Sequence, residues 1–152
     1  MLNLNFKDML SAFNAAKVEY LVVGAYAMAA HGCPRATGDI DFWVRPSMIN
    51  AERVWQALVA FGAPTSQILL EDFATLDVVY QIGLAPQRID ILTSISGIEF
   101  EAAWKNRLNA DLGGITAYVI SRSDLRQNKT SAARPKDLLD VQVLDGTKHR
   151  ES

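Results

Sequence analysis

The segment Asp39-Ile40-Asp41-Phe42-Trp43-Val44 constrains the fold most strongly, because acidic and apolar residues alternate along it. Successive side chains of a strand point to opposite faces, so Asp39 and Asp41 share one face while Ile40 and Phe42 share the other. The two carboxylates, roughly 7 Å apart along a strand, repel each other unless cations lie between them. The pattern is compatible with two solvated acids or with a magnesium site for phosphoryl or nucleotidyl transfer. Taken alone, it favours the solvated acids.

A third acidic residue, Asp90, lies within a second strand-like segment, Arg88-Ile89-Asp90-Ile91-Leu92, which is otherwise largely apolar. A buried carboxylate without a partner is costly, so Asp90 is expected to be paired, metal-bound or exposed. If this strand neighbours the first one, Asp90 can supply a third carboxylate to the same site. The alternative is a salt bridge with a nearby Arg or Lys.

Apolar periodicity and turn residues predict a chain that mixes helices and strands. Asn5 and Asn50 are expected to cap helices, and Gly62 is expected to end the helix that follows Asn50. The other expected helices cover residues 6–16, 25–30, 97–104, 121–132 and 135–146, and the strands cover residues 18–23, 39–44, 75–82, 88–92, 108–111 and 115–120.

The composition predicts one small α/β domain over residues 1–152, with a core at about 5–120 and a helical tail at about 121–146. The chain has 152 residues and a formal net charge of −2, which indicates no overall attraction to nucleic acid or to anionic membranes. The lone cysteine, Cys33, excludes an intramolecular disulfide and a multi-cysteine zinc site. With no targeting segment and no apolar stretch of membrane-spanning length, we expect a cytoplasmic protein.

The pair Gly24-Ala25 lies at an expected junction between a strand and a helix. Glycine allows close backbone approach, and the N–H groups at a helix start can bind phosphate. The alternative is that Gly24 merely separates the strand from the helix, and for a lone glycine this alternative is favoured.

The order of these motifs resembles the nucleotidyltransferase superfamily that includes DNA polymerase beta. More narrowly, the chain resembles the small AbiEii/AbiGii toxin-type bacterial nucleotidyltransferases, over residues 20–144. The residues that carry the resemblance are Gly24-Ala25, His31-Gly32, Arg35, Thr37, Asp39-Ile40-Asp41, Arg88 to Leu92, Lys129 and Lys136-Asp137. The family usually has Gly-Gly or Gly-Ser where this chain has Gly24-Ala25.

The resemblance implies an α/β (α+β) fold, a minimal nucleotidyltransferase with a short mixed sheet, flanking helices and a helical C-terminal tail. It implies that Asp39, Asp41 and Asp90 are catalytic and bind two magnesium ions. The nucleotide-binding residues that it implies are Gly24, Ala25, Arg35, Thr37 and Lys129. The implied reaction transfers a nucleoside monophosphate from a nucleoside triphosphate (NTP) to a protein or RNA acceptor, with a toxin–antitoxin pair as one setting. The alternative is a catalytically inactive module that binds nucleotide or a partner.

Several other polar and aromatic residues have a simpler expected role. The tail cations Arg122, Arg126, Arg134 and Lys136 are expected on solvated helix faces or paired with acids of the tail. Asp137 and Asp140 lie one helical turn apart and are expected to pair with those cations. His31 is expected to pack at a turn, and the residues Trp43, Trp55 and Trp104 are expected in the core.

Overall fold

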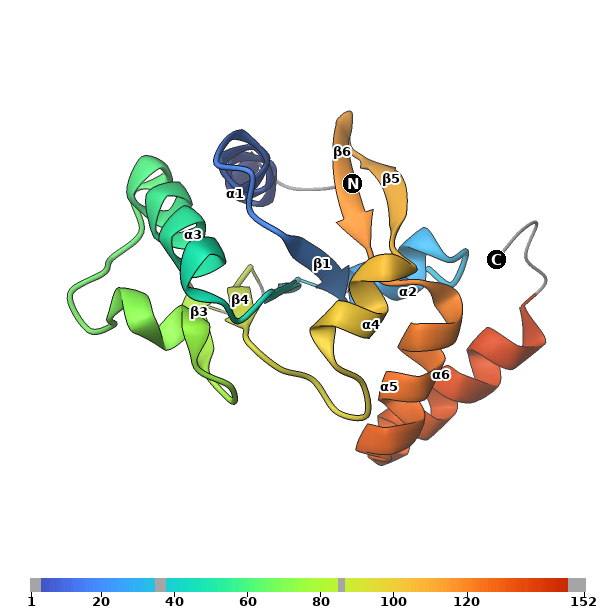
Figure 1. The fold of residues 1–152 in the computed structure, drawn as a ribbon. Helices are drawn as coiled ribbons and strands as arrows, with labels where there is room; N and C mark the ends of the chain where they lie inside the picture. Colours follow the sequence, from blue (N-terminus) through green and yellow to red (C-terminus); the bar gives the residue numbers. More distant parts are fainter. Residues whose placement is uncertain (1–3, 35–37, 85–86, 148–152) are drawn as a thin grey trace.

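The computed structural model describes residues 4–34, 38–84 and 87–147, which form a mixed six-stranded sheet flanked by helices (Figure 1). The strands follow the order β3-β4-β2-β1-β6-β5, in which β2/β4 and β1/β6 are parallel and the other neighbours antiparallel. Their bounds are Tyr20–Val23 (β1), Ile40–Val44 (β2), Val79–Ile82 (β3), Ile89–Leu92 (β4), Leu108–Leu112 (β5) and Ile115–Val119 (β6). This architecture confirms the predicted fold class.

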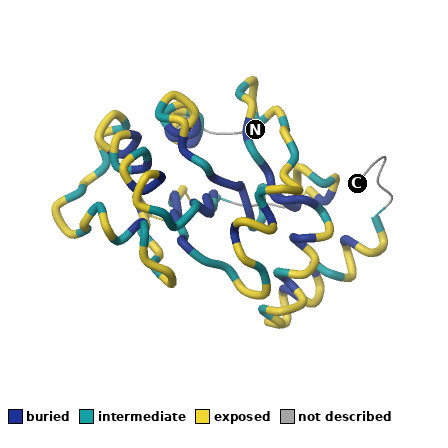
Figure 2. The backbone as a smooth tube through the Cα atoms, viewed as in Figure 1, coloured by how far each residue is buried: buried dark blue, intermediate teal, exposed yellow. Residues whose placement is uncertain are grey.

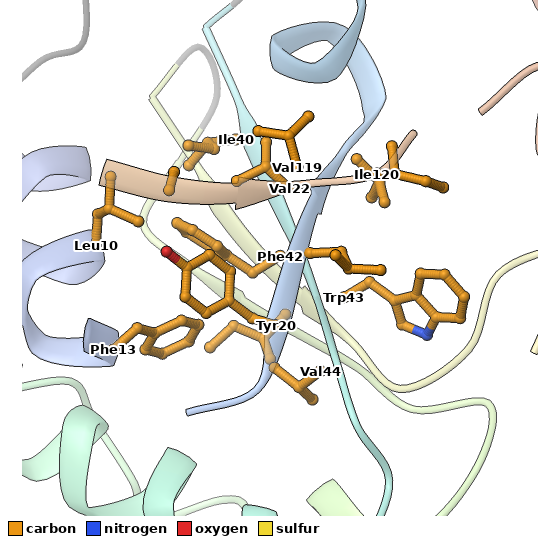
Figure 3. Close-up of a cluster of buried hydrophobic side chains, with 14 of the residues drawn as sticks. Leu10, Phe13, Tyr20, Val22, Ile40, Phe42, Trp43, Val44, Val119 and Ile120 are labelled. Atoms are coloured by element: carbon orange, nitrogen blue, oxygen red, sulfur yellow. The ribbon is translucent and has the colours of Figure 1, made fainter. Parts of the chain in front are cut away.

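The core lies on both faces of the central strands. On one face, Phe13 of helix α1 (Leu4–Ala15) packs against Phe42, with ring centroids 4.9 Å apart (Figure 3). On the other face, Trp43 packs against Phe100 of helix α4 (Phe100–Lys105) at 5.0 Å. Burial follows this arrangement (Figure 2), since every residue of β1 is buried while the edge strands β3 and β5 are partly exposed.

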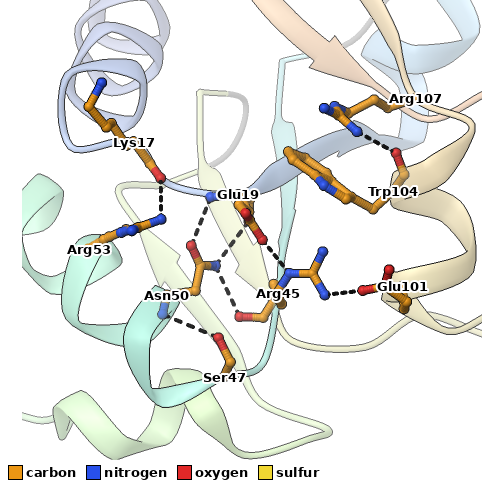
Figure 4. A network of polar contacts seen from close by, with 9 residues as sticks. All are labelled: Lys17, Glu19, Arg45, Ser47, Asn50, Arg53, Glu101, Trp104 and Arg107. Carbon is orange, nitrogen blue, oxygen red and sulfur yellow. Dashed lines mark hydrogen bonds and ion pairs between the residues drawn. The ribbon is translucent and has the colours of Figure 1, made fainter.

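The long helix α3 (Met48–Phe61) begins earlier than the sequence predicts. Ser47 is its N-cap, and the Ser47 hydroxyl accepts a hydrogen bond from the Asn50 N–H at 3.2 Å. Asn50 is buried instead, and its side chain bonds the backbone of Glu19 and Arg45 (Figure 4). The predicted capping by Asn50 is therefore wrong, because tertiary contacts engage its amide. Gly62 ends the helix in the left-handed conformation, as predicted.

Asn5 lies inside α1, so its predicted capping is also wrong. The strand predicted over residues 75–82 is confined to β3, because Asp77 has a φ of +65° that interrupts extended backbone. A short 3-10 helix, η1 (Leu70–Ala74), precedes it and was not predicted. The helix predicted over residues 97–104 begins only at Phe100.

The C-terminal half otherwise follows the prediction. Strands β5 and β6 form a hairpin around Gly113 and Gly114, whose φ angles are +67° and +92°. Helix α5 (Arg122–Ala132) is capped by Ser121, and helix α6 (Pro135–Gly146) has proline in its first turn. These helices pack against each other and form the predicted helical tail. Across the described ranges, no helix has the length and apolar character needed to cross a membrane.

Candidate active site

Asp41 and Asp90 face each other across neighbouring parallel strands. β2 and β4 pair with Asp41 opposite Asp90, so both carboxylates lie on the same face of the sheet. Asp39 directly precedes β2. All three acids line one cavity of about 680 Å³, together with Gly24 and Lys129. The strand of Asp90 therefore neighbours the strand of Asp41, which was the condition for Asp90 to supply a third carboxylate to the same site.

The charge on Asp41 is costly in this environment. Burial, followed by the neighbouring charge and hydrogen bond of Asp90, raises the pKa of Asp41 to about 7. Asp39 raises this pKa further, and Arg88 lowers it. In this arrangement the Asp41 carboxyl therefore keeps its proton until the pH approaches 7.

Arg88 supplies the salt bridge that the sequence left open as an alternative for Asp90. Its Nε and Nη2 atoms donate to the two Asp90 carboxylate oxygens at 2.7 and 3.1 Å. Nη2 also lies 3.3 Å from Asp39 Oδ2, and the Arg88 backbone N–H donates to Asp39 Oδ1 at 3.0 Å. One guanidinium thus neutralises part of the charge of two of the three acids.

The acids of this cavity match magnesium in donor chemistry, although they are not gathered around one point. Among residues 4–34, 38–84 and 87–147, no group of three or more His, Cys, Asp or Glu side chains is arranged to hold a metal ion. Magnesium prefers oxygen ligands, and Asp41 and Asp90 bring carboxylates together whose repulsion a divalent cation would relieve. The donor set therefore fits this metal. In the described structure Arg88 contacts the Asp39 and Asp90 carboxylates.

Gly24 makes the close approach to Asp41 possible. It starts helix α2 (Gly24–Ala30) directly after β1, with a φ of +71°. A Cβ atom at this position would lie 2.2 Å from Asp41 Oδ2, far inside van der Waals contact. Any other residue would displace the Asp41 carboxylate. Gly24 therefore has a steric role in the site and does not merely separate the strand from the helix. Ala25 follows it and lines the same cavity.

Lys129 reaches the cavity from α5 but is already paired. Its Nζ lies 2.8 Å from Asp140 Oδ2 and 3.6 Å from Asp137 Oδ1, and all three residues are buried. Arg134 also binds Asp137, with Nε 2.6 Å from Oδ2. These contacts confirm that Asp137 and Asp140 pair with cations of the tail. Arg134 and Lys136 line the cavity as well.

Two predicted nucleotide-binding residues, Arg35 and Thr37, lie outside the described residues. His31 packs as expected, with its ring Nε2 2.8 Å from the Ile120 carbonyl oxygen. Trp43 is in the core, as predicted, while Trp55 and Trp104 are partly buried against it.

The loop after β4 was not predicted as part of the site, and Ser94, Ile95 and Ser96 of this loop line the cavity. Two side chains of α5 hold this loop: Gln127 donates to the Gly97 carbonyl at 2.6 Å, and Asn128 to the Ser96 carbonyl at 3.0 Å. The available signal was its position directly after the strand that carries Asp90, because ligand sites often lie beyond strand ends.

No family model and no curated protein sequence matches this chain. Solved structures do match it in fold. A candidate nucleotidyltransferase, TM1012 from Thermotoga maritima, aligns with a TM-score of 0.61 at 13% identity, covering 90% of this chain and 88% of that one. The antibiotic-resistance factor ANT(2'')-Ia aligns at 0.62 and 13% identity, covering 92% and 80%. The lincosamide antibiotic adenylyltransferase LnuA, bound to lincomycin, aligns at 0.63 and 13% identity, covering 97% and 99%. The chain therefore has the fold of nucleotidyltransferases.

Proposed function

We propose that this protein is a magnesium-dependent nucleotidyltransferase that transfers a nucleoside monophosphate from an NTP to an acceptor hydroxyl. The observation that carries the proposal is the register of β2 and β4, which places Asp41 opposite Asp90 in a cavity of about 680 Å³. The fold shared with nucleotidyltransferases supports the same reaction class.

Asp39, Asp41 and Asp90 would hold the metal, which supplies positive charge for the triphosphate and for the leaving pyrophosphate. The acceptor oxygen attacks the α-phosphorus, and a new O–P bond forms as the bond to the bridging oxygen of the β-phosphate breaks. Pyrophosphate leaves, and Asp90 accepts the proton of the hydroxyl. Because Arg88 binds Asp90 in the described structure, this role requires Arg88 to release that carboxylate.

The nucleotide would contact the start of α2 and the nearby cations. Gly24 and Ala25 line the cavity, and the alanine keeps its backbone N–H for a phosphate oxygen. Lys129 would donate hydrogen bonds to the triphosphate. It would add little net positive charge, because Asp137 and Asp140 balance the charge of its ammonium group. Arg35 and Thr37 complete the proposed set on the strength of the sequence resemblance.

Three acceptor classes are consistent with the proposed reaction. The resemblance to the AbiEii/AbiGii-type proteins implies a protein or RNA acceptor, with a toxin–antitoxin pair as one setting. Two of the similar structures are named as an antibiotic-resistance factor and an antibiotic adenylyltransferase. A small molecule with a free hydroxyl is therefore a third acceptor class.

A transfer assay tests the proposal with each labelled NTP, magnesium, and three acceptor arms: RNA, lysate protein and small alcohols. We expect label transfer in at least one arm and a loss of about 100-fold or more in the Asp41→Asn variant. Asp111→Asn is the matched control, because Asp111 is an exposed acid on β5 outside the cavity. No transfer in any arm, or equal rates in the two variants, would contradict the proposal.

An inactive nucleotide-binding module is the second candidate, favoured by Ala25 in the glycine motif and by the Arg88 contacts to two acids. Titration calorimetry with each NTP separates the two candidates. Binding without any label transfer would support the module, and transfer that depends on Asp41 would exclude it.

A further inference from the structure

Arg88 is anchored to the sheet through its backbone, and this anchoring does not depend on its side chain. The Arg88 N–H donates to Asp39 Oδ1 at 3.0 Å, and the Arg88 carbonyl accepts the Ile40 N–H at 3.1 Å. The side chain is 29% exposed and lines the cavity of the three acids, here called the acid cavity. Because β4 begins directly after it, the guanidinium can change partners while the register of β4 on β2 stays in place.

The guanidinium of Arg88 binds the same oxygens that a metal ion would need. Its Nε and Nη2 atoms engage both oxygens of Asp90, at 2.7 and 3.1 Å, and Nη2 lies 3.3 Å from Asp39 Oδ2. A guanidinium that stayed at these distances would repel a divalent cation bound to the same carboxylates. Metal and Arg88 therefore compete for Asp39 and Asp90, and metal binding requires the Arg88 side chain to move away.

Arg88 differs from the other paired cations of the acid cavity in what it would leave behind. Lys129 is paired with Asp137 and Asp140, and Arg134 is paired with Asp137. Both aspartates are almost fully buried, so a cation that moved away would leave a buried charge with less compensation, which is costly. A metal ion at the proposed site would instead take over the two carboxylates that Arg88 releases.

The side chain of Arg88 is also suited to a phosphate group in the same cavity. A guanidinium presents two parallel N–H donors, and these match a phosphate in the same two-pronged geometry as a carboxylate. Gly24 and Ala25, the proposed contacts of the triphosphate, line the acid cavity together with Arg88. A released guanidinium therefore has a new anionic partner within the cavity that it already lines.

We propose that Arg88 exchanges partners when substrate binds. Without substrate, its guanidinium holds Asp39 and Asp90; with metal and triphosphate bound, it binds a phosphate group and leaves both carboxylates to the metal. The exchange rests on the proposed function, which supplies the metal and the triphosphate. It makes Arg88 a nucleotide-positioning residue and couples the two ligands, because each one stabilises the state that the other needs.

Titration calorimetry with magnesium alone tests the competition. Arg88→Gln removes the guanidinium from the acids, so at pH 9 this variant should bind magnesium about tenfold more tightly than the unaltered protein. The high pH limits competition from the proton of Asp41, whose pKa Arg88 lowers. Arg126→Gln is the matched control and should leave the affinity unchanged, because Arg126 binds Asp145 through the same two nitrogens outside the acid cavity. Equal or weaker binding by Arg88→Gln would overturn the proposal.

The unaltered protein gives a second readout that depends on no substitution. When magnesium and inorganic tripolyphosphate are both present, the Nε–H NMR signal of Arg88 should shift and show a coupling to phosphorus across the new hydrogen bond. The Nε–H signal of Arg126 should stay unchanged. If Arg88 only stabilises the fold, its signal stays that of a group bound to carboxylate, and this result would overturn the proposal.

The exchange and the proposed function can fail separately. If label transfer occurs while the Arg88 signal stays unchanged, the exchange is wrong and the proposed function stands. If Arg88→Gln binds magnesium more tightly and the Arg88 signal moves, but no acceptor is ever labelled, the exchange stands as a property of metal and phosphate binding and the proposed function is wrong.

Discussion

At the scale of single residues, Asp41 determines how the site responds to pH. Its pKa is raised to about 7 in the folded protein from an ordinary value of 3.8, so the folded state binds more protons than the unfolded state between these pH values. Its contribution to stability is therefore fully present below about pH 4 and is lost as the pH rises to about 7. A residue at position 41 that cannot ionise would not lose this stability as the pH rises.

Asp41→Asn should accordingly raise the free energy of unfolding at pH 8 by up to about 4 kcal/mol, because one pKa unit corresponds to about 1.4 kcal/mol and the pKa of Asp41 is raised from 3.8 to about 7. The gain should shrink toward zero near pH 4. Urea unfolding at both pH values measures it, with Asp111→Asn as the control. An equal gain at both pH values would show that the titration of Asp41 is not its cause.

Gly24 is the second residue on which the site depends, and alanine substitution distinguishes its steric role from that of a glycine that only ends a helix. Gly24→Ala adds a Cβ that would lie 2.2 Å from Asp41 Oδ2. Gly62 has a similar positive φ of +89°, but a Cβ added there would have no atom within 4 Å. Gly62→Ala should cost about 1–2 kcal/mol through backbone strain alone. Gly24→Ala should cost at least about 1 kcal/mol more, measured by thermal unfolding. Equal losses would mean that the Asp41 side chain moves aside freely.

At the scale of elements, the pairing of α5 with α6 depends on the buried charges of Lys129, Asp137 and Asp140. Lys129→Met leaves two buried carboxylates with less compensation and should destabilise the protein by about 3–5 kcal/mol. Arg126→Met breaks an exposed pair with Asp145 between the same helices and should cost less than about 1 kcal/mol. Chemical denaturation compares the two variants. Similar losses would indicate that the buried pair contributes no more than a surface one.

At the scale of the whole molecule, a metal that binds only the folded chain must stabilise it. Magnesium at about ten times its dissociation constant should add about 1.4 kcal/mol to the free energy of unfolding at pH 8. The gain should be smaller at pH 6, where the proton on Asp41 competes with the metal. Thermal unfolding with magnesium and then with excess EDTA measures the effect. Asp41→Asn should abolish it, and a gain that survives this substitution would place the metal elsewhere.

The local patterns were enough for most helices and strands but not for every cap and boundary. The glycine at position 62 ends α3 as predicted, because its conformation depends on neighbouring residues alone. Asn50 was misassigned, because its amide bonds Glu19, which is distant in sequence. The loop at Ser94 to Ser96 has no motif of its own, and its role follows from its position after β4 and from the cavity beside it.

The resemblance to nucleotidyltransferases implied a mixed sheet with a helical tail. The sequence by itself determined that Asp39 and Asp41 belong to one strand segment and that Gly24 follows a buried strand. These features depend on the two-residue period of a strand and on backbone preferences, which act over a few residues. Only the tertiary structure decided that Asp90 lies opposite Asp41, that Arg88 binds two of the three acids, and that Lys129 is neutralised. Asp39 and Asp41 are far from Arg88 and Asp90 along the chain, and Lys129 meets its aspartates only where α5 packs on α6. The packing of the whole core selects which strands and helices meet.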